Sequence, residues 1–168
     1  MRRELRILQI SLLGAVLWCT QQGAQAQVLA STAATSKVAR MSMAEGIAAN
    51  NRALLDLITK AGLVPVLSSS EAYTFLAPPP EAIPKLQQKS PEELKELFLD
   101  HILVGTVTSA DFKDGTDVKT LGGGTLRVFR KKNSIWIDGL ELKEADQLFV
   151  NGVLHQLSGI MQPKRSAF

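Results

Sequence analysis

The chain has 168 residues, with 19 Lys and Arg, 16 Asp and Glu, and a formal net charge of +3. This length suits one domain with its own hydrophobic core. Much of the positive charge lies near the N-terminus, and without the first 26 residues the charge is (19 − 3) − (16 − 1) = +1. A nearly neutral surface gives no electrostatic reason to expect nucleic acid as a partner.

Residues 1–26 have the three-part layout of a secretory signal peptide. Basic residues precede an apolar run at residues 7–18, and small residues follow as far as Ala24-Gln25-Ala26. The apolar run has about 12 residues, whereas a helix that spans a bilayer needs roughly 20, which favours cleavage over a transmembrane anchor. We therefore expect cleavage after Ala26 and export from the cytoplasm.

Cys19 leaves a lipid anchor as a weaker alternative. Bacterial lipid attachment requires a small residue just before the cysteine, and the bulky Trp18 stands there. Cys19 is the only cysteine of the chain. After cleavage the domain would contain no disulfide, so its core would have to hold the fold together.

The predicted elements begin with helices. Residues 27–41 are rich in Ala, Ser and Thr without any period, so we expect a flexible lead-in before a helix capped by Ser42. The next helix should end near Gly62, and residues 63–67 should form a further helical turn. Its apolar face has the spacing i, i+3, i+4, i+7: the residues are Leu54, Leu57, Ile58 and Ala61.

The middle of the chain alternates between strand and helix signals. Residues 72–77 predict a strand that ends at the prolines, and residues 80–87 predict a short helix. Ser90, Pro91 and Glu93 then predict a capping box at the start of a longer helix. One face of that helix should point to the core: it carries Leu94, Leu97, Phe98 and His101.

Beyond Gly105 the hydrophobic period changes from helical to two. Residues 125–131 alternate, and residues 135–137 follow after a short turn, so the pair predicts a β-hairpin. Further strands are expected at residues 140–142 and 153–157. Helices followed by a run of short strands favour the α+β class over a parallel doubly wound sheet.

Three stretches in this order resemble the signatures of the fasciclin domain family. They are YTFLAP at residues 73–78, HILVG at residues 101–105 and NGVLH at residues 151–155, and the DG…V.TL.G rhythm of residues 114–122 also fits. The resemblance covers about residues 42–163, with a tail at residues 164–168. It implies a wedge in which the N-terminal helices pack on two small β-sheets. The motif residues that it identifies are Thr74, Phe75, Pro78, His101, Asp146, Asn151 and His155.

The resemblance also implies a function outside the cytoplasm. Members of the family are extracellular or surface modules for adhesion and protein contact, and some secreted relatives carry apolar pigments such as carotenoids. The chain departs from the family pattern at Pro79-Pro80, where Thr-Asn is usual. Asp146 matches the Asp of an Asp-Ile pair linked to integrin binding, but Gln147 replaces the Ile, which puts an integrin-like role in doubt.

The polar residues with possible chemistry favour a structural interpretation. We expect His101 and His155 to be buried, with ring nitrogens bonded to the backbone or to Tyr73 and Asn151. Two histidines without a cysteine do not make a zinc site, and the sequence around Ser158 is not a nucleophile elbow. We therefore expect neither an enzyme nor a bound metal or cofactor.

One basic cluster stands out at the predicted hairpin. It could contact acidic polysaccharide or lipid headgroups, although such a run is more often a solvated tip. The nearby aromatic residues Phe129 and Trp136 are expected in the core, together with Leu86, Phe112 and Phe149. The cluster consists of Arg127, Arg130, Lys131 and Lys132.

Two functions remain open from the sequence. The first is a secreted, periplasmic or cell-surface adhesion module that binds a protein or polysaccharide. The second is a carrier of an apolar small molecule such as a carotenoid, held in a groove between the helices and the sheet edge. Fold resemblance alone does not decide between them.

Overall fold

The computed structural model describes residues 40–162. The predicted signal peptide, the lipid-anchor alternative at Cys19, most of the lead-in and the C-terminal tail lie outside the described residues. Within the described part no helix is both long and apolar enough to cross a membrane.

Helices dominate the first part of the described chain, and strands dominate the second. The helices are α1 (Met43–Asn50), α2 (Arg52–Lys60), α3 (Val64–Ser68), the 3₁₀ turn η1 (Pro80–Ala82), α4 (Ile83–Gln87) and α5 (Pro91–His101). The strands are β1 (Tyr73–Ala77), β2 (Ile102–Val104), β3 (Asp117–Lys119), β4 (Thr125–Lys131), β5 (Ser134–Ile137), β6 (Leu140–Phe149) and β7 (Gly152–Leu157). The α+β class is confirmed.

Side-chain caps fix where α1 and α5 begin. The Ser90 hydroxyl accepts the Glu93 N–H (3.2 Å), and the Glu93 carboxylate accepts the Ser90 N–H (3.0 Å). Ser42 and Glu45 form the same reciprocal pair at the start of α1. The predicted caps at Ser42 and Ser90 are therefore confirmed, and they satisfy backbone donors that no helical carbonyl can reach.

The strands form one continuous sheet in the order β2-β1-β7-β6-β5-β4-β3, in which only the pair β1 and β7 is parallel. The expectation of two small sheets needs correction here, because β6 pairs with β7 along most of its length and with β5 at its start. Two register shifts interrupt β6 between Leu142 and Gln147. They break its period of two, which is why the sequence predicted only residues 140–142 as a strand.

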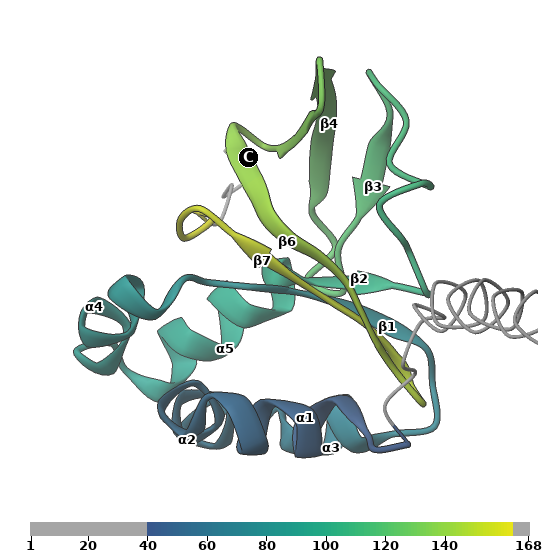
Figure 1. The fold of residues 1–168 in the computed structure, drawn as a ribbon. Coiled ribbons are helices and arrows are strands. Elements are labelled where there is room, and N and C mark those ends of the chain that lie inside the picture. Colours follow the sequence, from purple (N-terminus) through teal and green to yellow (C-terminus); the bar gives the residue numbers. More distant parts are fainter. Residues whose placement is uncertain (1–39, 163–168) are drawn as a thin grey trace, which may run out of the picture. The chain divides into compact units, whose positions relative to one another are not determined.

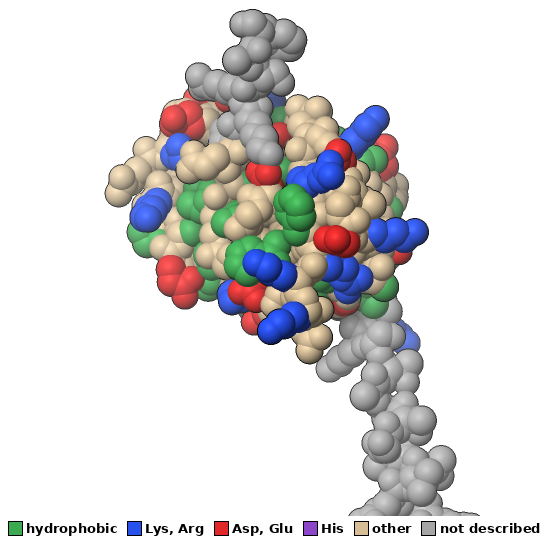
Figure 2. Space-filling view, turned by 90° about the horizontal axis from the view of Figure 1, so that it is seen from above, with side chains coloured by type: hydrophobic (Ala, Val, Ile, Leu, Met, Phe, Trp, Pro, Cys, Tyr) green, Lys and Arg blue, Asp and Glu red, His purple; other side chains and the backbone are tan. Residues whose placement is uncertain are grey.

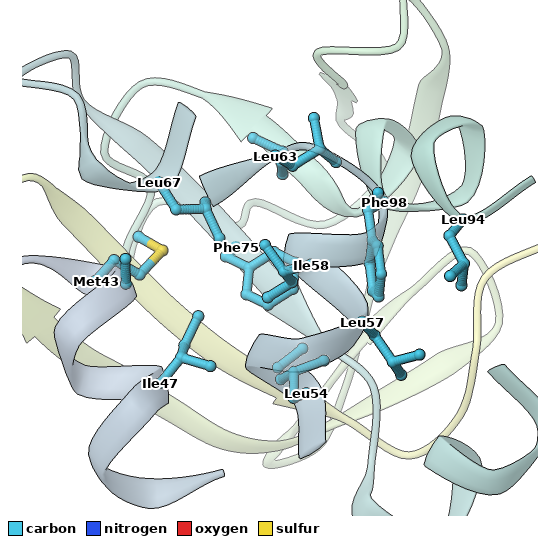
Figure 3. Close-up of a cluster of buried hydrophobic side chains, with 14 of the residues drawn as sticks. Met43, Ile47, Leu54, Leu57, Ile58, Leu63, Leu67, Phe75, Leu94 and Phe98 are labelled. Carbon is cyan, nitrogen blue, oxygen red and sulfur yellow. The ribbon is translucent and has the colours of Figure 1, made fainter. Parts of the chain in front are cut away.

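The sheet separates two hydrophobic clusters. Strand β1 contributes to both, because Phe75 faces the helices and Leu76 faces the opposite side. Figure 1 shows α1, α2 and α3 along one side, with β3 and β4 rising on the other. In the helical cluster, drawn in Figure 3, the rings of Phe75 and Phe98 have centroids 6.2 Å apart.

The second cluster lies beneath the β4–β5 hairpin. It contains Phe112, Leu126 and Val128. Leu86 and Phe112 are buried as predicted, but Phe149 and Trp136 are only partly buried. Phe129 was predicted in the core and is 51% exposed. That prediction was wrong because Leu126 and Val128 occupy the inward positions of β4, so residue 129 points outward.

Candidate functional site

Two family-motif residues join strands to neighbouring segments through buried polar groups. The Thr74 hydroxyl donates to the Gly105 carbonyl (2.8 Å) and accepts the Val107 N–H (2.8 Å). The Thr74 side chain is fully buried. It ties β1 to the loop that follows β2, and it leaves no hydroxyl group for an outside partner.

Asn151 makes similar links at the turn between β6 and β7. Its amide oxygen accepts the Met43 N–H (2.8 Å), and its amide nitrogen donates to the Leu67 and Ser69 carbonyls (2.7 and 3.0 Å). The next residue, Gly152, has φ 149°, and a Cβ there would lie 1.9 Å from the Tyr73 carbonyl oxygen. The Asn-Gly pair therefore packs inside the fold and does not form an exposed recognition loop.

His101 is buried at the end of α5. Its Nε2 accepts the Met161 N–H (3.2 Å), so the neutral ring carries its proton on Nδ1 and donates to the Leu97 carbonyl (2.8 Å). Burial lowers the pKa of His101 to about 4. The ring is therefore neutral at pH 7, and both of its nitrogens are bonded inside the protein.

His155 is buried on the opposite side of the sheet, edge-on to Phe112 with centroids 5.5 Å apart. Its Nδ1 accepts the Asp146 N–H (3.0 Å), and its Nε2 donates to the Val107 carbonyl (2.8 Å). Burial lowers the pKa of His155, although the Val107 bond and the Asp146 charge oppose the shift. Both histidines thus use backbone partners, and neither bonds to Tyr73 or Asn151.

Asp146 lies at the irregular part of β6, with its backbone in the left-handed region (φ 61°). Its carboxylate accepts the Ser109 N–H (2.7 Å) and the Ser109 hydroxyl. The carboxylate of the motif Asp is therefore engaged within the fold. In residues 40–162 no three His, Asp or Glu side chains form a group that could hold a metal ion.

The remaining motif residues, Phe75 and Pro78, are also buried. Phe75 belongs to the helical cluster. Pro78 precedes Pro79, which has an extended backbone and caps η1, while Pro80 occupies its first position. The proline pair that replaces the family's Thr-Asn thus starts a helical turn.

The basic residues of the hairpin are exposed. Arg127 pairs with Asp117 on β3 (3.2 Å). Arg130, Lys131 and Lys132 form no ion pair with any carboxylate in the described range. Lys132 lies in the hairpin turn with φ 54°. The free cations therefore gather at the end of β4 and in the turn.

An exposed aromatic side chain accompanies these cations. Phe129 pairs across the hairpin with Trp136, which is half-buried. The sequence contained a signal for this position, because the alternation of β4 places residue 129 opposite the core positions. Figure 2 looks down on this half of the molecule and shows Lys and Arg side chains interspersed with carboxylates and hydrophobic groups. We call Phe129, Arg130, Lys131 and Lys132 the hairpin patch.

A groove lies between the helices and the sheet, in the region where the carrier hypothesis expected one. Its volume is about 380 Å³. Residues from α1, α2, the segment after β1, β6 and β7 line it, and they include both apolar and polar side chains. The lining is therefore mixed, whereas a carrier for an apolar pigment would need a mostly apolar one.

The sequence pattern of the Fasciclin domain family matches residues 49–163. Among curated relatives, "Fasciclin-like arabinogalactan protein CTB11" from Cercospora beticola is 32% identical over 119 residues, which are 67% of this chain and 32% of the relative. "Transforming growth factor-beta-induced protein ig-h3" from Sus scrofa is 30% identical over 63% of this chain and 17% of its own length. Periostin from Homo sapiens is 29% identical over 64% of this chain and 13% of its own length. The chain thus spans a third or less of these proteins.

A solved structure supports the same fold. The FAS1 domain pair of the insect cell adhesion molecule Fasciclin I superposes with a TM-score of 0.57 over 73% of this chain and 51% of that one, at 12% identity. At this identity the likeness concerns the fold alone. Since the family pattern spans well over half of the sequence, the chain belongs to the fasciclin domain family.

Proposed function

We propose that the protein is an extracytoplasmic adhesion module that binds an acidic polysaccharide through the hairpin patch. The proposal includes cleavage after Ala26, delivery of residues 27–168 to the periplasm, the cell surface or the outside, and folding of residues 42–163 as the domain. Membership of the fasciclin domain family supports the general role. The observation that carries the site is the set of three exposed cations at the end of β4 and in the turn, without ion-pair partners in the described range. The exposed Phe129 lies on the same face of β4 as Lys131.

The chemistry of the hairpin patch suits a polyanion with sugar rings. Arg130, Lys131 and Lys132 supply positive charge and form no ion pair in the described range, although the Asp114 carboxylate accepts the backbone N–H of Arg130 (2.7 Å). The Phe129 ring offers an apolar surface for the C–H face of a sugar, and aromatic residues and arginine are the usual anchors of contact sites. Attraction between exposed charges is screened beyond about 8 Å at physiological salt, so binding should weaken as salt rises.

The proposal gives the protein no catalytic role. The ring nitrogens of both histidines are bonded to backbone groups inside the fold. The motif residues therefore stabilise the fold, and in this proposal side chains of the hairpin contact the partner. Carriage of an apolar pigment is not included, because polar side chains make up much of the groove lining.

The test compares two triple variants of the mature protein that remove the same charge. R130A/K131A/K132A changes the hairpin patch, while the control R52A/K85A/K95A changes exposed residues of α2, α4 and α5. On immobilised polygalacturonate we expect the hairpin variant to lose at least about tenfold in affinity and most of its salt dependence. The control should bind as the unaltered protein does.

Three results would count against the proposal. Equal losses in both variants would mean that only net charge matters. Unchanged binding in the hairpin variant would move the site elsewhere. No binding of the unaltered protein to polygalacturonate, together with capture of an acidic peptide, would replace the polysaccharide with a protein partner.

A further inference from the structure

The groove is built where segments that are distant in the sequence come together. Asn50 and Asn51 lie at the junction of α1 and α2, Gln147 and Phe149 come from β6, and Gln156 comes from β7. The volume of about 380 Å³ falls within the range of roughly 300–1,000 Å³ that is usual for small-ligand sites. The groove is separate from the hairpin patch, since none of the residues of that patch lines it.

The inner surface of the groove is apolar and closely packed. Ile47, Leu54 and Leu154 are buried members of the helical cluster, and Phe149 packs against them. A Cβ on Gly46 would lie 2.0 Å from Cε1 of Phe149. The phenyl ring therefore rests directly on the α1 backbone, which fixes its position as one wall of the groove.

Polar side chains with free hydrogen-bonding groups surround this apolar surface. The Gln147 amide nitrogen donates to Glu144 (3.0 Å), which leaves the amide oxygen of Gln147 available. Within residues 40–162 the side chains of Asn50 and Gln156 make no hydrogen bond to another group of the protein. A carboxamide both donates and accepts, as a hydroxyl group does, so these groups match hydroxyls better than they match ions.

The charge of the groove disfavours anions. Among the lining residues that belong to the described range 40–162, Glu144 is the only charged one, and none is a lysine or an arginine. A phosphate, a sulfate or a uronic acid would meet a carboxylate without any compensating cation. A neutral ligand avoids this repulsion and still has hydrogen-bond partners.

From these features we propose that the groove binds a neutral sugar unit of a glycan. The C–H face of the ring would lie on Phe149, and its hydroxyls would bond to Asn50, Gln147 and Gln156. This site is independent of the hairpin patch, which needs a negatively charged partner.

The test is a titration of the isotope-labelled mature protein with neutral disaccharides, namely cellobiose, maltose and lactose. We expect at least one of them to shift the side-chain amide signals of Asn50 and Gln156. The variant N50A/Q156M should raise the dissociation constant of that sugar at least about tenfold. Q88M, which removes an exposed amide next to α4, should leave it unchanged.

The hairpin variant R130A/K131A/K132A separates the two proposals, because it should bind the disaccharide normally even if polygalacturonate binding is lost. The groove proposal is overturned if none of the three sugars shifts these signals up to its solubility limit. It is also overturned if N50A/Q156M, with an unchanged backbone spectrum, keeps the full affinity. Binding of retinol in the groove without any sugar binding would overturn it in favour of an apolar carrier.

Discussion

The two sides of the sheet differ in how much of their surface is left exposed. On the helical side, α1, α2 and α5 cover β1 and β7, and the motif residue Asn151 bonds to backbone groups of Met43 and Leu67. On the other side, the β4–β5 hairpin covers a smaller cluster with one face and exposes the opposite face, which carries Phe129. The comparison teaches that the residues that identify the family hold the fold together. The surfaces with free chemical groups lie outside those motifs.

The largest expected effect tests whether the two clusters unfold together. Phe98 belongs to the helical cluster and Phe112 to the other, and both are fully buried. Phe98→Ala and Phe112→Ala should each lower the free energy of unfolding by about 3–5 kcal/mol, because each leaves a cavity. Urea denaturation followed by circular dichroism measures both losses.

Amide hydrogen exchange shows whether the two sides of the sheet unfold as one unit. Since β6 and β7 connect the two clusters, we expect each substitution to reduce protection across β1, β6 and β7 alike. If Phe112→Ala exposes only β3, β4 and β5 while β1 keeps its full protection, the strand side is a separate unit of unfolding.

The second effect concerns pH, because each side of the sheet contains one buried histidine. The pKa of folded His101 is about 4, below the value of 6.5 that is usual for histidine. Between these values the unfolded chain binds the proton and the folded protein does not, so stability is full above pH 6.5 and falls as the pH drops toward 4. The loss should be about 3 kcal/mol for His101. The lowered pKa of His155 adds a loss of the same sign.

Denaturation at a series of pH values between 7.5 and 4.5 measures this slope. His101→Gln should lower stability at pH 7.5, since the Leu97 carbonyl loses the ring N–H that donates to it, and it should also flatten the slope. A variant that retains the full slope would show that His101 is not the source of the pH dependence.

Local signals in the sequence were sufficient to predict the helices. The caps at Ser42 and Ser90 and the apolar face of α2 depend on residues a few positions apart. The second half of β6 could not be predicted in the same way, because its register shifts remove the alternation. β2 follows α5 without a turn, so its three apolar residues look the same in a helix or a strand.

The residues that line the groove could not be predicted from the sequence. Its lining joins Asn50 to Gln147 and Gln156, and only the pairing of β6 with β7 beside α1 brings them together. Phe129 differs, since the alternation of β4 already indicated an outward side chain. The prediction of a core position followed from the hydrophobic character of Phe129, whereas its position in the strand indicates the solvent-exposed face.

A smaller effect is expected at Thr74, where one hydroxyl both donates and accepts. Thr74→Val keeps the shape of the side chain but leaves the Val107 N–H and the Gly105 carbonyl without this partner. We expect a loss of about 1–3 kcal/mol in the free energy of unfolding. Thr125→Val, at an exposed position of β4, is the control and should change stability little. Equal stability of both variants would show that the buried hydroxyl contributes nothing.

The smallest effect on stability should come from the hairpin patch. Arg130, Lys131 and Lys132 are exposed and form no ion pair in the described range, so R130A/K131A/K132A should alter the free energy of unfolding by no more than about 0.5 kcal/mol. Urea denaturation of the same preparation used for binding tests this directly. Lost binding with unchanged stability assigns these cations to contact, because their side chains then contribute to the complex and not to the fold. A loss of several kcal/mol would instead make them part of the scaffold, and the contrast between the two sides of the sheet would fail.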